Sequence, residues 1–232
     1  MDSKKDFILL LDTSTDVCSL ALSTHFNLIS SISDETMERK HAALLPLLID
    51  DLLVKSKITL DQVSAVAYSQ GPGSYTGLRV GLSSAKAICM AANVPLIAVS
   101  TLAGLAHSVQ DTSSYDFIVP MIDAGRNEVY HAVYDAHYNE VHSPSPLLLE
   151  ESSVDVYQKH GSRIIIVGDG SVKAKKILKA AESAFYGTNK MLAQYMIVPA
   201  TNKFLSSEFE NLAYSVPFYL KSPDYKKSTI KI

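Results

Sequence analysis

The fold is decided by the stretch Phe7-Ile-Leu-Leu-Leu-Asp-Thr-Ser-Thr-Asp16, near the start of the 232-residue chain. Its first five residues are an apolar run of strand length, and its last five are turn-forming residues. Because the run is apolar at every position, we expect a strand covered on both faces of a sheet. Residues 17–22 and 28–32 predict two more strands after tight turns, so the chain opens with a three-stranded meander.

The next elements alternate between helices and strands. Leucines at three- and four-residue spacing predict a helix over residues 39–57. Further apolar residues widen its stripe beyond one face, so this helix needs a second burial partner. Residues 63–68 and 94–99 predict buried strands on either side of a helix over 77–92, and another helix follows. Residues 1–110 therefore predict the order βββαβαβα.

The same order restarts near residue 117. Residues 117–123, 129–134 and 140–149 predict three strands, and the prolines of the third suit a sheet edge. Residues 163–167 predict a strand, and residues 173–185 predict a basic amphipathic helix. We expect an α/β protein of two βββαβα lobes: an N-terminal lobe over 1–110 that carries the partner-binding helices, and a reduced C-terminal lobe over 111–232. Its basic tail, from about residue 221, is expected to be frayed.

Composition excludes several classes of protein. The chain is 47% hydrophobic and 19% charged with a net charge of -3, which excludes a disordered acidic tail and a strongly basic nucleic-acid binder. Cys18 and Cys89 lie in apolar stretches and are expected to be buried thiols. The chain shows neither a secretory signal nor an apolar stretch long enough for a membrane span, so we expect a cytoplasmic protein without a membrane partner.

Each half has an Asp-containing turn after its first strand, and this doubled order resembles the actin-like ATPase and sugar-kinase superfamily. The resemblance implies that the turns at Asp12 and Asp123 face each other across a cleft that handles phosphate and metal. The loop Gly168-Asp-Gly-Ser171 falls where that superfamily places its adenosine-side glycine loop. The alternative is that such carboxylates are only turn or cap residues. The candidate nucleotide contacts are Asp12, Ser14, Gly71, Gly73, Ser74, Asp123, Gly168 and Gly170.

The loop Gly71-Pro-Gly-Ser-Tyr-Thr-Gly77 lies between a predicted strand and a predicted helix. Its amides and the helix N-terminus are suited to hold an anion. It is not a nucleotide P-loop, because no Gly-Lys-Ser/Thr follows. The alternative is a tight turn in which Ser74 or Thr76 caps the helix.

The string Gln70-Gly-Pro-Gly-Ser-Tyr-Thr-Gly-Leu-Arg-Val-Gly81 is similar to the TsaB (YeaZ) family. So are the segments 39–46, 95–102, 121–124, 128–130 and 217–220, which follow in the family's order over essentially the whole chain. The resemblance implies a non-catalytic relative of TsaD, the subunit that transfers a threonylcarbamoyl group to adenosine 37 of tRNAs reading ANN codons. It implies a TsaB–TsaD heterodimer that is joined by the ATPase TsaE. It also implies that this chain associates with tRNA only indirectly, through that complex. We expect no cofactor of the chain's own, and ATP or ADP at the interface of the complex.

An older name for this group is glycoprotease, and a metal-dependent protease of this kind would need a pair of metal-binding histidines. TsaD-like subunits carry two histidines four residues apart on one helix face, where they bind metal. Thr101 and Leu105 stand at these positions here, and His107 has no histidine four residues away. We therefore predict neither a catalytic residue nor a metal site in this chain.

The two helices of the first half are expected to contact the TsaD-like partner. One has excess apolar surface, and the other has a stripe of small residues that permits close approach. Without the partner, we expect the same surface to form a two-fold homodimer. A different class of function is a small-molecule phosphotransferase or ATPase that uses Asp12 and Asp123. The predicted interface residues are His41, Leu44, Leu45, Leu48, Leu52, Gly77, Arg79, Gly81, Ser84 and Ala85.

Overall fold

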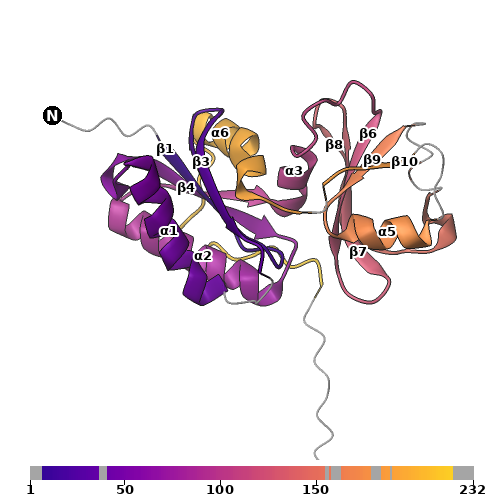
Figure 1. The fold of residues 1–232 in the computed structure, drawn as a ribbon, viewed down its shortest axis with the longest axis horizontal. Coiled ribbons are helices and arrows are strands. Elements are labelled where there is room, and N and C mark those ends of the chain that lie inside the picture. Colours follow the sequence, from indigo (N-terminus) through magenta and orange to yellow (C-terminus); the bar gives the residue numbers. More distant parts are fainter. Residues whose placement is uncertain are drawn as a thin grey trace, which may run out of the picture.

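The computed structural model describes residues 7–36, 41–154, 157, 163–178, 184–188 and 190–221. Within these residues, ten strands form two five-stranded sheets that belong to two lobes (Figure 1). The first sheet has the order β3-β2-β1-β4-β5. Its strands are β1 (Phe7–Asp12), β2 (Cys18–Thr24), β3 (Asn27–Asp34), β4 (Val63–Gly71) and β5 (Leu96–Ser100).

Strand β1 lies at the centre of the first sheet. It pairs antiparallel with β2, where Leu10 faces Ala21, and parallel with β4, where Leu9 faces Val66. Its side chains alternate between the two faces of the sheet, and both faces are buried. The prediction of a strand covered on both sides is therefore confirmed.

Helices cover both faces of the first sheet. The helices α1 (His41–Ser56) and α2 (Tyr75–Ala92) lie together on its outer face, where Leu45 and Leu52 pack into the core (Figure 1). The short α3 (Thr101–Ala106) lies on the opposite face, and a 3-10 turn, η1 (Leu60–Gln62), leads into β4. Helix α2 is capped by Asn93, whose φ of 51° lies in the left-handed region that closes a helix.

The second sheet has the order β10-β9-β6-β7-β8, which repeats the order of the first when strands are counted within each lobe. The predicted doubling is therefore confirmed at the level of topology. The proline-containing β8 lies at the edge, as predicted, and α5 (Gly170–Ile177) covers the outer face. The strands are β6 (Phe117–Asp123), β7 (Glu128–Asp135), β8 (Glu140–Leu148), β9 (Ile164–Val167) and β10 (Ala184–Tyr186), and a 3-10 turn, η2 (Glu151–Val154), follows β8.

Two predictions about the second half were wrong. The helix predicted over residues 173–185 ends at Ile177, and Ala184–Tyr186 pair with β9 as a parallel strand. The boundary of the C-terminal lobe also needs correction, because the chain returns to the first lobe through η3 (Ala193–Met196) and α6 (Ile197–Leu205). The Ala193 amide donates to Ser19 Oγ at 3.0 Å, and Thr201 Oγ1 donates to the His25 carbonyl at 2.6 Å.

A shared core joins the two lobes. It contains Leu102 and Leu105 of α3, Ile118 and Ile122 of β6, and Met196 of η3. No helix among the described residues is both long enough and apolar enough to cross a bilayer. Arg39 at the predicted helix start and the tail beyond Lys221, with Lys226, Lys227 and Lys231, lie outside the described residues.

Candidate functional site

The turns after β1 and β6 meet at a cleft between the lobes. Its inner part encloses about 500 Å³, and the predicted contacts Ser14, Ser74 and Asp123 all line it. The prediction that the two turns face each other is therefore confirmed. The other lining residues of this inner part are Thr15, Asp16, Ile122, Gly125 and Asp169.

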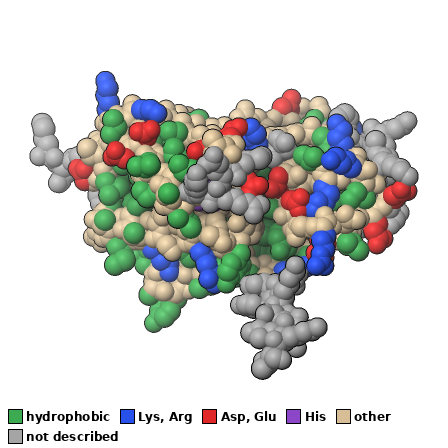
Figure 2. Space-filling view, turned by 60° about the horizontal axis from the view of Figure 1, so that its bottom comes forward, with side chains coloured by type: hydrophobic (Ala, Val, Ile, Leu, Met, Phe, Trp, Pro, Cys, Tyr) green, Lys and Arg blue, Asp and Glu red, His purple; other side chains and the backbone are tan. Residues whose placement is uncertain are grey.

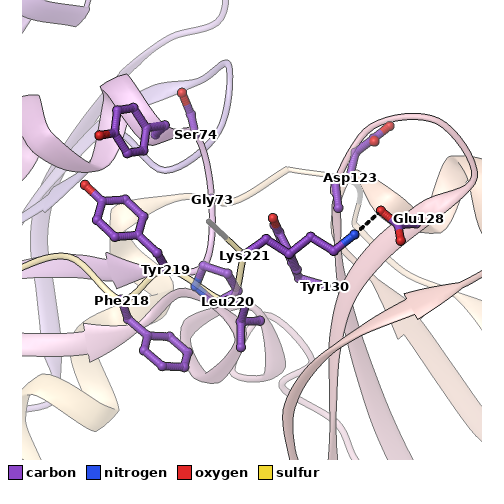
Figure 3. Close-up of a pocket in the computed structure, with 12 residues that line it drawn as sticks. Gly73, Ser74, Asp123, Glu128, Tyr130, Phe218, Tyr219, Leu220 and Lys221 are labelled. Carbon is purple, nitrogen blue, oxygen red and sulfur yellow. Dashed lines mark hydrogen bonds and ion pairs between the residues drawn. The ribbon is translucent and has the colours of Figure 1, made fainter. Parts of the chain in front are cut away.

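The outer part of the cleft encloses about 290 Å³ and shares Ser74 and Asp123 with the inner part (Figure 3). One wall is the loop over residues 72–75, and the facing wall comes from residues 123–130 of the second lobe. A third wall is formed by residues 218–221, close to the end of the described chain. No site role was predicted for these residues, although residues 217–220 belong to one of the family-like segments.

The inner cleft is acidic. Asp16, Asp123 and Asp169 line it, and among the described lining residues there is neither a Lys nor an Arg. Burial raises the pKa of Asp169 to about 6, although the Asp123 amide donates to its carboxylate at 2.8 Å. Lys173 Nζ pairs with Asp123 Oδ1 at 2.6 Å. Since like charges repel, this arrangement does not favour a free phosphate.

Asp12 does not reach the cleft, which corrects its prediction as a nucleotide contact. It is fully buried, and burial raises its pKa. Its Oδ1 accepts from the Ser14 amide at 3.3 Å and from Ser14 Oγ at 2.7 Å, so the carboxylate shapes the turn. Its Oδ2 lacks a hydrogen-bond partner in the described part of the chain.

The predicted glycines serve close packing. A β-carbon on Gly73 would lie 2.4 Å from the Ser14 carbonyl oxygen, and one on Gly168 would lie 2.2 Å from that of Met121. Gly71 is as confined, a β-carbon on Gly170 would lie 2.9 Å from Met121 Cβ, and none of Gly71, Gly168 and Gly170 lines the cleft. Ser74 is the N-cap of α2, where its Oγ accepts from the Gly77 amide at 3.3 Å. The alternative of a tight turn with a capping serine is therefore confirmed.

The two positions that the resemblance aligns with metal-binding histidines lie inside the protein. Thr101 and Leu105 of α3 are both fully buried. His107 is the C-cap of α3, where its Nδ1 lies 2.9 Å from the Ala103 carbonyl oxygen and its ring stacks on Tyr138. Across the described residues, His, Cys, Asp and Glu do not gather in the groups of three or more that hold a metal ion.

Most of the predicted interface residues face inward, which corrects that list. Helix α2 uses its small residues to approach the β1 turn of the same chain, and a β-carbon on Gly77 would meet the Thr13 carbonyl oxygen. His41 holds the start of α1 through its Nε2, 2.9 Å from the Thr15 carbonyl oxygen. The buried residues are His41, Leu45, Leu52, Gly77, Gly81 and Ala85; Leu44, Leu48 and Ser84 are half-buried, and Arg79 is exposed.

The predicted interface residues do not include the apolar residues that these helices expose most. Leu47 and Val54 of α1 are 66% and 68% exposed, and Met90 of α2 is 74% exposed. Figure 2 shows hydrophobic side chains over the half of the molecule that carries these helices. We call Leu47, Val54 and Met90 the outer helical face. Leu47 and Val54 are among the apolar residues that widen the stripe of the first helix beyond its core-facing side, and this excess was the signal for the face.

The sequence also missed a buried histidine network in the second lobe. His131 of β7 is 2% exposed, and its two ring nitrogens lie 3.0 Å from Ser145 Oγ and 3.1 Å from the Tyr157 hydroxyl. Ser145 Oγ also lies 3.0 Å from His142 Nε2. The network joins β7 to the edge strand β8, so we assign it to structure.

Known proteins share this architecture. A family model described as TsaD, tRNA N6-adenosine threonylcarbamoyltransferase, matches residues 29–228. The tRNA threonylcarbamoyladenosine biosynthesis protein TsaB of Buchnera aphidicola subsp. Schizaphis graminum is 30% identical over 74% of this chain and 82% of that relative. The chain belongs to the TsaB family.

Two further TsaB-family proteins define the extent of the match. TsaB of Haemophilus influenzae is 38% identical over 128 residues, which cover 53% of this chain and only 51% of that protein, about half its length. The crystal structure of YeaZ from Pseudomonas aeruginosa has a TM-score of 0.79 and 26% identity, and the match covers 93% of this chain and all of that one. With the doubled sheet order, this confirms the predicted fold, that of actin-like ATPases and sugar kinases.

Proposed function

We propose that this chain is a non-catalytic subunit that supports threonylcarbamoylation of adenosine 37 in tRNAs reading ANN codons. It binds a TsaD-like transferase, is joined there by a TsaE-like ATPase, and meets tRNA through that complex. Its membership of the TsaB family supports this, because the relatives are named tRNA threonylcarbamoyladenosine biosynthesis proteins. The net charge of -3 fits a chain whose main partner is another protein.

The observation that carries the proposal is the outer helical face. Large apolar side chains at these exposures are costly in water, and their grouping on two neighbouring helices is typical of a protein interface. The inward sides of the same helices are already buried against the sheet. In the proposed complex, α1 and α2 therefore contribute Leu47, Val54 and Met90 rather than the residues that the helical pattern first indicated.

The non-catalytic part of the proposal rests on α3 and the cleft. The resemblance aligns Thr101 and Leu105 with metal-binding histidines, and both side chains lack solvent access. A metal-dependent transferase or peptidase needs ligands that an ion and a substrate can reach. This chain therefore assists the chemistry of its partner.

A phosphotransferase or ATPase that uses Asp12 and Asp123 has less support. Asp12 is sealed beneath the turn, and only Asp123 lines the cleft. The described residues that line the inner cleft also include no Lys or Arg that could pair with a nucleotide phosphate. We place any ATP or ADP at the junction of this chain with its partners, and propose no cofactor of its own.

In the absence of the partner, we propose that the outer helical face pairs with that of a second copy. A two-fold axis brings the same patch of each copy together, so the exposed apolar side chains of one copy are buried against those of the other. We place the chain in the cytoplasm, where tRNA modification would take place. Sedimentation at increasing concentration tests the homodimer, and Val54→Asp is expected to keep the chain monomeric.

The binding test uses the purified chain and its cognate TsaD-like transferase. We expect Leu47→Asp and Met90→Asp to weaken the complex by about thirtyfold or more, as removal of a hot-spot side chain costs about 2 kcal/mol. Leu148→Asp is the matched control, because Leu148 is 53% exposed on β8 of the other lobe. A complex that survives both helix variants, measured by titration calorimetry, contradicts the assigned face.

The functional test is reconstitution of the modification. TsaD-like and TsaE-like proteins are incubated with tRNA, threonine, bicarbonate and ATP, with and without this chain, and modified adenosine is measured by mass spectrometry. We expect product only when the chain is present, and none from the chain alone. Equal yields without the chain, or product from the chain alone, contradict the proposed role.

A further inference from the structure

The segment over residues 215–221, here named the strap, runs from the first lobe to the second. In Figure 1 it is the yellow segment that ends between the lobes. Strands, helices and the shared core already account for the fold, so the strap is an additional connection. Its contacts fall into three groups, namely anchors on the first lobe, a wall of the cleft, and an ion pair with the second lobe.

The first anchor is at Ser215. Its Oγ lies 2.9 Å from the hydroxyl of Tyr68, and both side chains are buried. Its carbonyl oxygen accepts from Lys86 Nζ of α2 at 2.9 Å. Buried polar groups that satisfy each other in this way hold a segment in one position.

The second anchor is the backbone around Phe218. Its amide donates to the Gln70 carbonyl at 2.8 Å, at the end of β4. Its carbonyl oxygen lies so near Gly71 that a β-carbon there would be 2.4 Å away, and Gly71 has a φ of 124°, which favours glycine. The backbone of β4 is therefore shaped to accept the strap.

The third anchor is aromatic. Arg79 Nε of α2 donates to the Tyr219 hydroxyl at 3.0 Å, and the guanidinium lies 4.1 Å from the centre of the Tyr75 ring. The Tyr75 and Tyr219 rings are 5.0 Å apart. Cation–π and ring contacts of this kind add to the hydrogen bond and fix the direction of the chain after Phe218.

Beyond these anchors the strap reaches the second lobe. Lys221 pairs with Glu128 at the start of β7, and the dashed line in Figure 3 marks this contact. Residues 218–221 also form a wall of the outer cleft opposite Asp123, Glu128 and Tyr130. A segment fixed to one lobe and paired with the other limits how far the two lobes separate.

We propose that residues 215–221 are a strap that restrains the separation of the two lobes and so sets the opening of the cleft. The restraint belongs to the isolated chain and does not depend on the proposed partner. Release of Lys221 from Glu128, or of the anchors from α2 and β4, allows the second lobe to move away from the first. The cleft then widens on the side where the strap forms its wall.

The test measures the distance between the lobes by pulsed electron resonance. Spin labels are attached at Asn202→Cys on α6 and Lys176→Cys on α5, which are both exposed positions. Cys18 and Cys89 need no replacement, because they are buried. Labelled chain is diluted into unlabelled chain, so that distances between two copies do not contribute.

The decisive comparison is between two shortened chains. One ends after Val216 and lacks most of the strap, whereas the matched control ends after Lys221 and keeps it. We expect the distance distribution of the first to broaden and its mean to lengthen by several ångströms, while the control matches the full chain. Identical distributions in the two shortened chains overturn the proposal.

Point variants keep the test decisive if the shorter chain does not fold. Lys221→Ala removes the pair between lobes, and Tyr219→Phe removes the hydroxyl that Arg79 binds. Lys55→Ala is the matched control, because it removes an exposed ion pair with Asp51 that lies within one lobe. We expect both strap variants to broaden the distribution and the control to leave it unchanged. Unchanged distributions in both strap variants overturn the proposal, whether or not the shorter chain folds.

Discussion

A β-carbon on Gly77 would lie 2.0 Å from the carbonyl oxygen of Thr13, so the first turn of α2 fits against the β1 turn only because position 77 is glycine. Thr13 Oγ1 also donates to the Gly77 carbonyl at 2.7 Å. This contact ties the glycine-rich loop to the turn that bears Asp12 and Ser14. The small-residue stripe of α2 thus packs against the β1 turn of the same chain.

The first prediction follows from this contact. We expect Gly77→Ala to lower the free energy of unfolding by about 1–3 kcal/mol, because the added methyl group overpacks a site whose neighbour is backbone. Urea unfolding followed by circular dichroism measures the change. Ser83→Ala, on an exposed position of the same helix, is the control and should change stability by about 0.5 kcal/mol or less. If Gly77→Ala is as stable as the control, the prediction is wrong, and the β1 turn at Thr13 moves away from the added methyl group without a loss in the free energy of unfolding.

The second prediction concerns His131. Burial, and then the charge of His142, lowers its pKa from 6.5 to about 4. The folded chain therefore binds fewer protons than the unfolded chain between these values, so stability from His131 is present above pH 6.5 and is lost as the pH falls toward 4. The loss amounts to about 3 kcal/mol at most.

Urea unfolding at a series of pH values tests this. We expect His131→Gln to have a flatter pH dependence than the natural chain between pH 4 and 6.5. His137→Gln, at an exposed position of the β7–β8 turn, serves as the control and should keep the natural slope. Parallel curves for His131→Gln and the natural chain exclude this histidine as the source of the slope.

The third prediction concerns Asp169, whose contribution to stability changes with pH in the opposite direction to that of His131. Burial raises the pKa of Asp169 from 3.8 to about 6, so its folded form holds a proton more tightly than its unfolded form. The resulting stability is present at low pH and is lost as the pH rises through 6. We expect Asp169→Asn to stabilise the chain above pH 6 by about 1–2 kcal/mol, a value reduced for its partial exposure to water.

The same unfolding measurement checks Asp169→Asn. Its advantage over the natural chain should shrink as the pH is lowered toward 4, where the natural carboxyl group is protonated in the folded state. Asp51→Asn on α1 replaces an exposed carboxylate and is the control. If the higher free energy of unfolding of Asp169→Asn does not change with pH, its cause is packing rather than the charge of the carboxylate.

The fourth prediction concerns the two thiols. Burial raises the pKa of both Cys18 and Cys89 to about 12, and the charges of Asp12 and Asp34 add to the effect at Cys18. The reactive thiolate is therefore scarce in the folded chain at neutral pH. We expect a thiol reagent such as dithionitrobenzoate to modify both cysteines only as urea unfolds the chain. Rapid modification of either cysteine in the folded chain contradicts this.

The central strands were predictable because they are buried on both faces. The apolar runs that became β1, β4, β6 and β9 are of strand length and lie between turn residues, and together these features favour a buried strand. The restart of the element order predicted the second sheet in the same way. The edge strand β8 followed from its prolines, which cannot donate to a neighbouring strand.

The errors arose where tertiary contacts decide. Residues 184–186 carry little strand signal of their own and pair because β9 offers them a free edge. Helical periodicity also identifies two apolar stripes on α1 and α2 without indicating which side meets the sheet, so the inward residues were assigned to the partner. Asp12 was assigned to the cleft from the superfamily resemblance, and the sequence does not indicate how deeply its carboxylate is buried.

The residues that hold α1 and α2 on the sheet are not the residues that these helices present to the outside. Leu45, Leu52 and Ala85 build the core, whereas Leu47, Val54 and Met90 contribute little to it. Natural selection can therefore change the outer set without eroding the stability of the chain. The outer surface and the core of the same two helices can therefore evolve as separate traits.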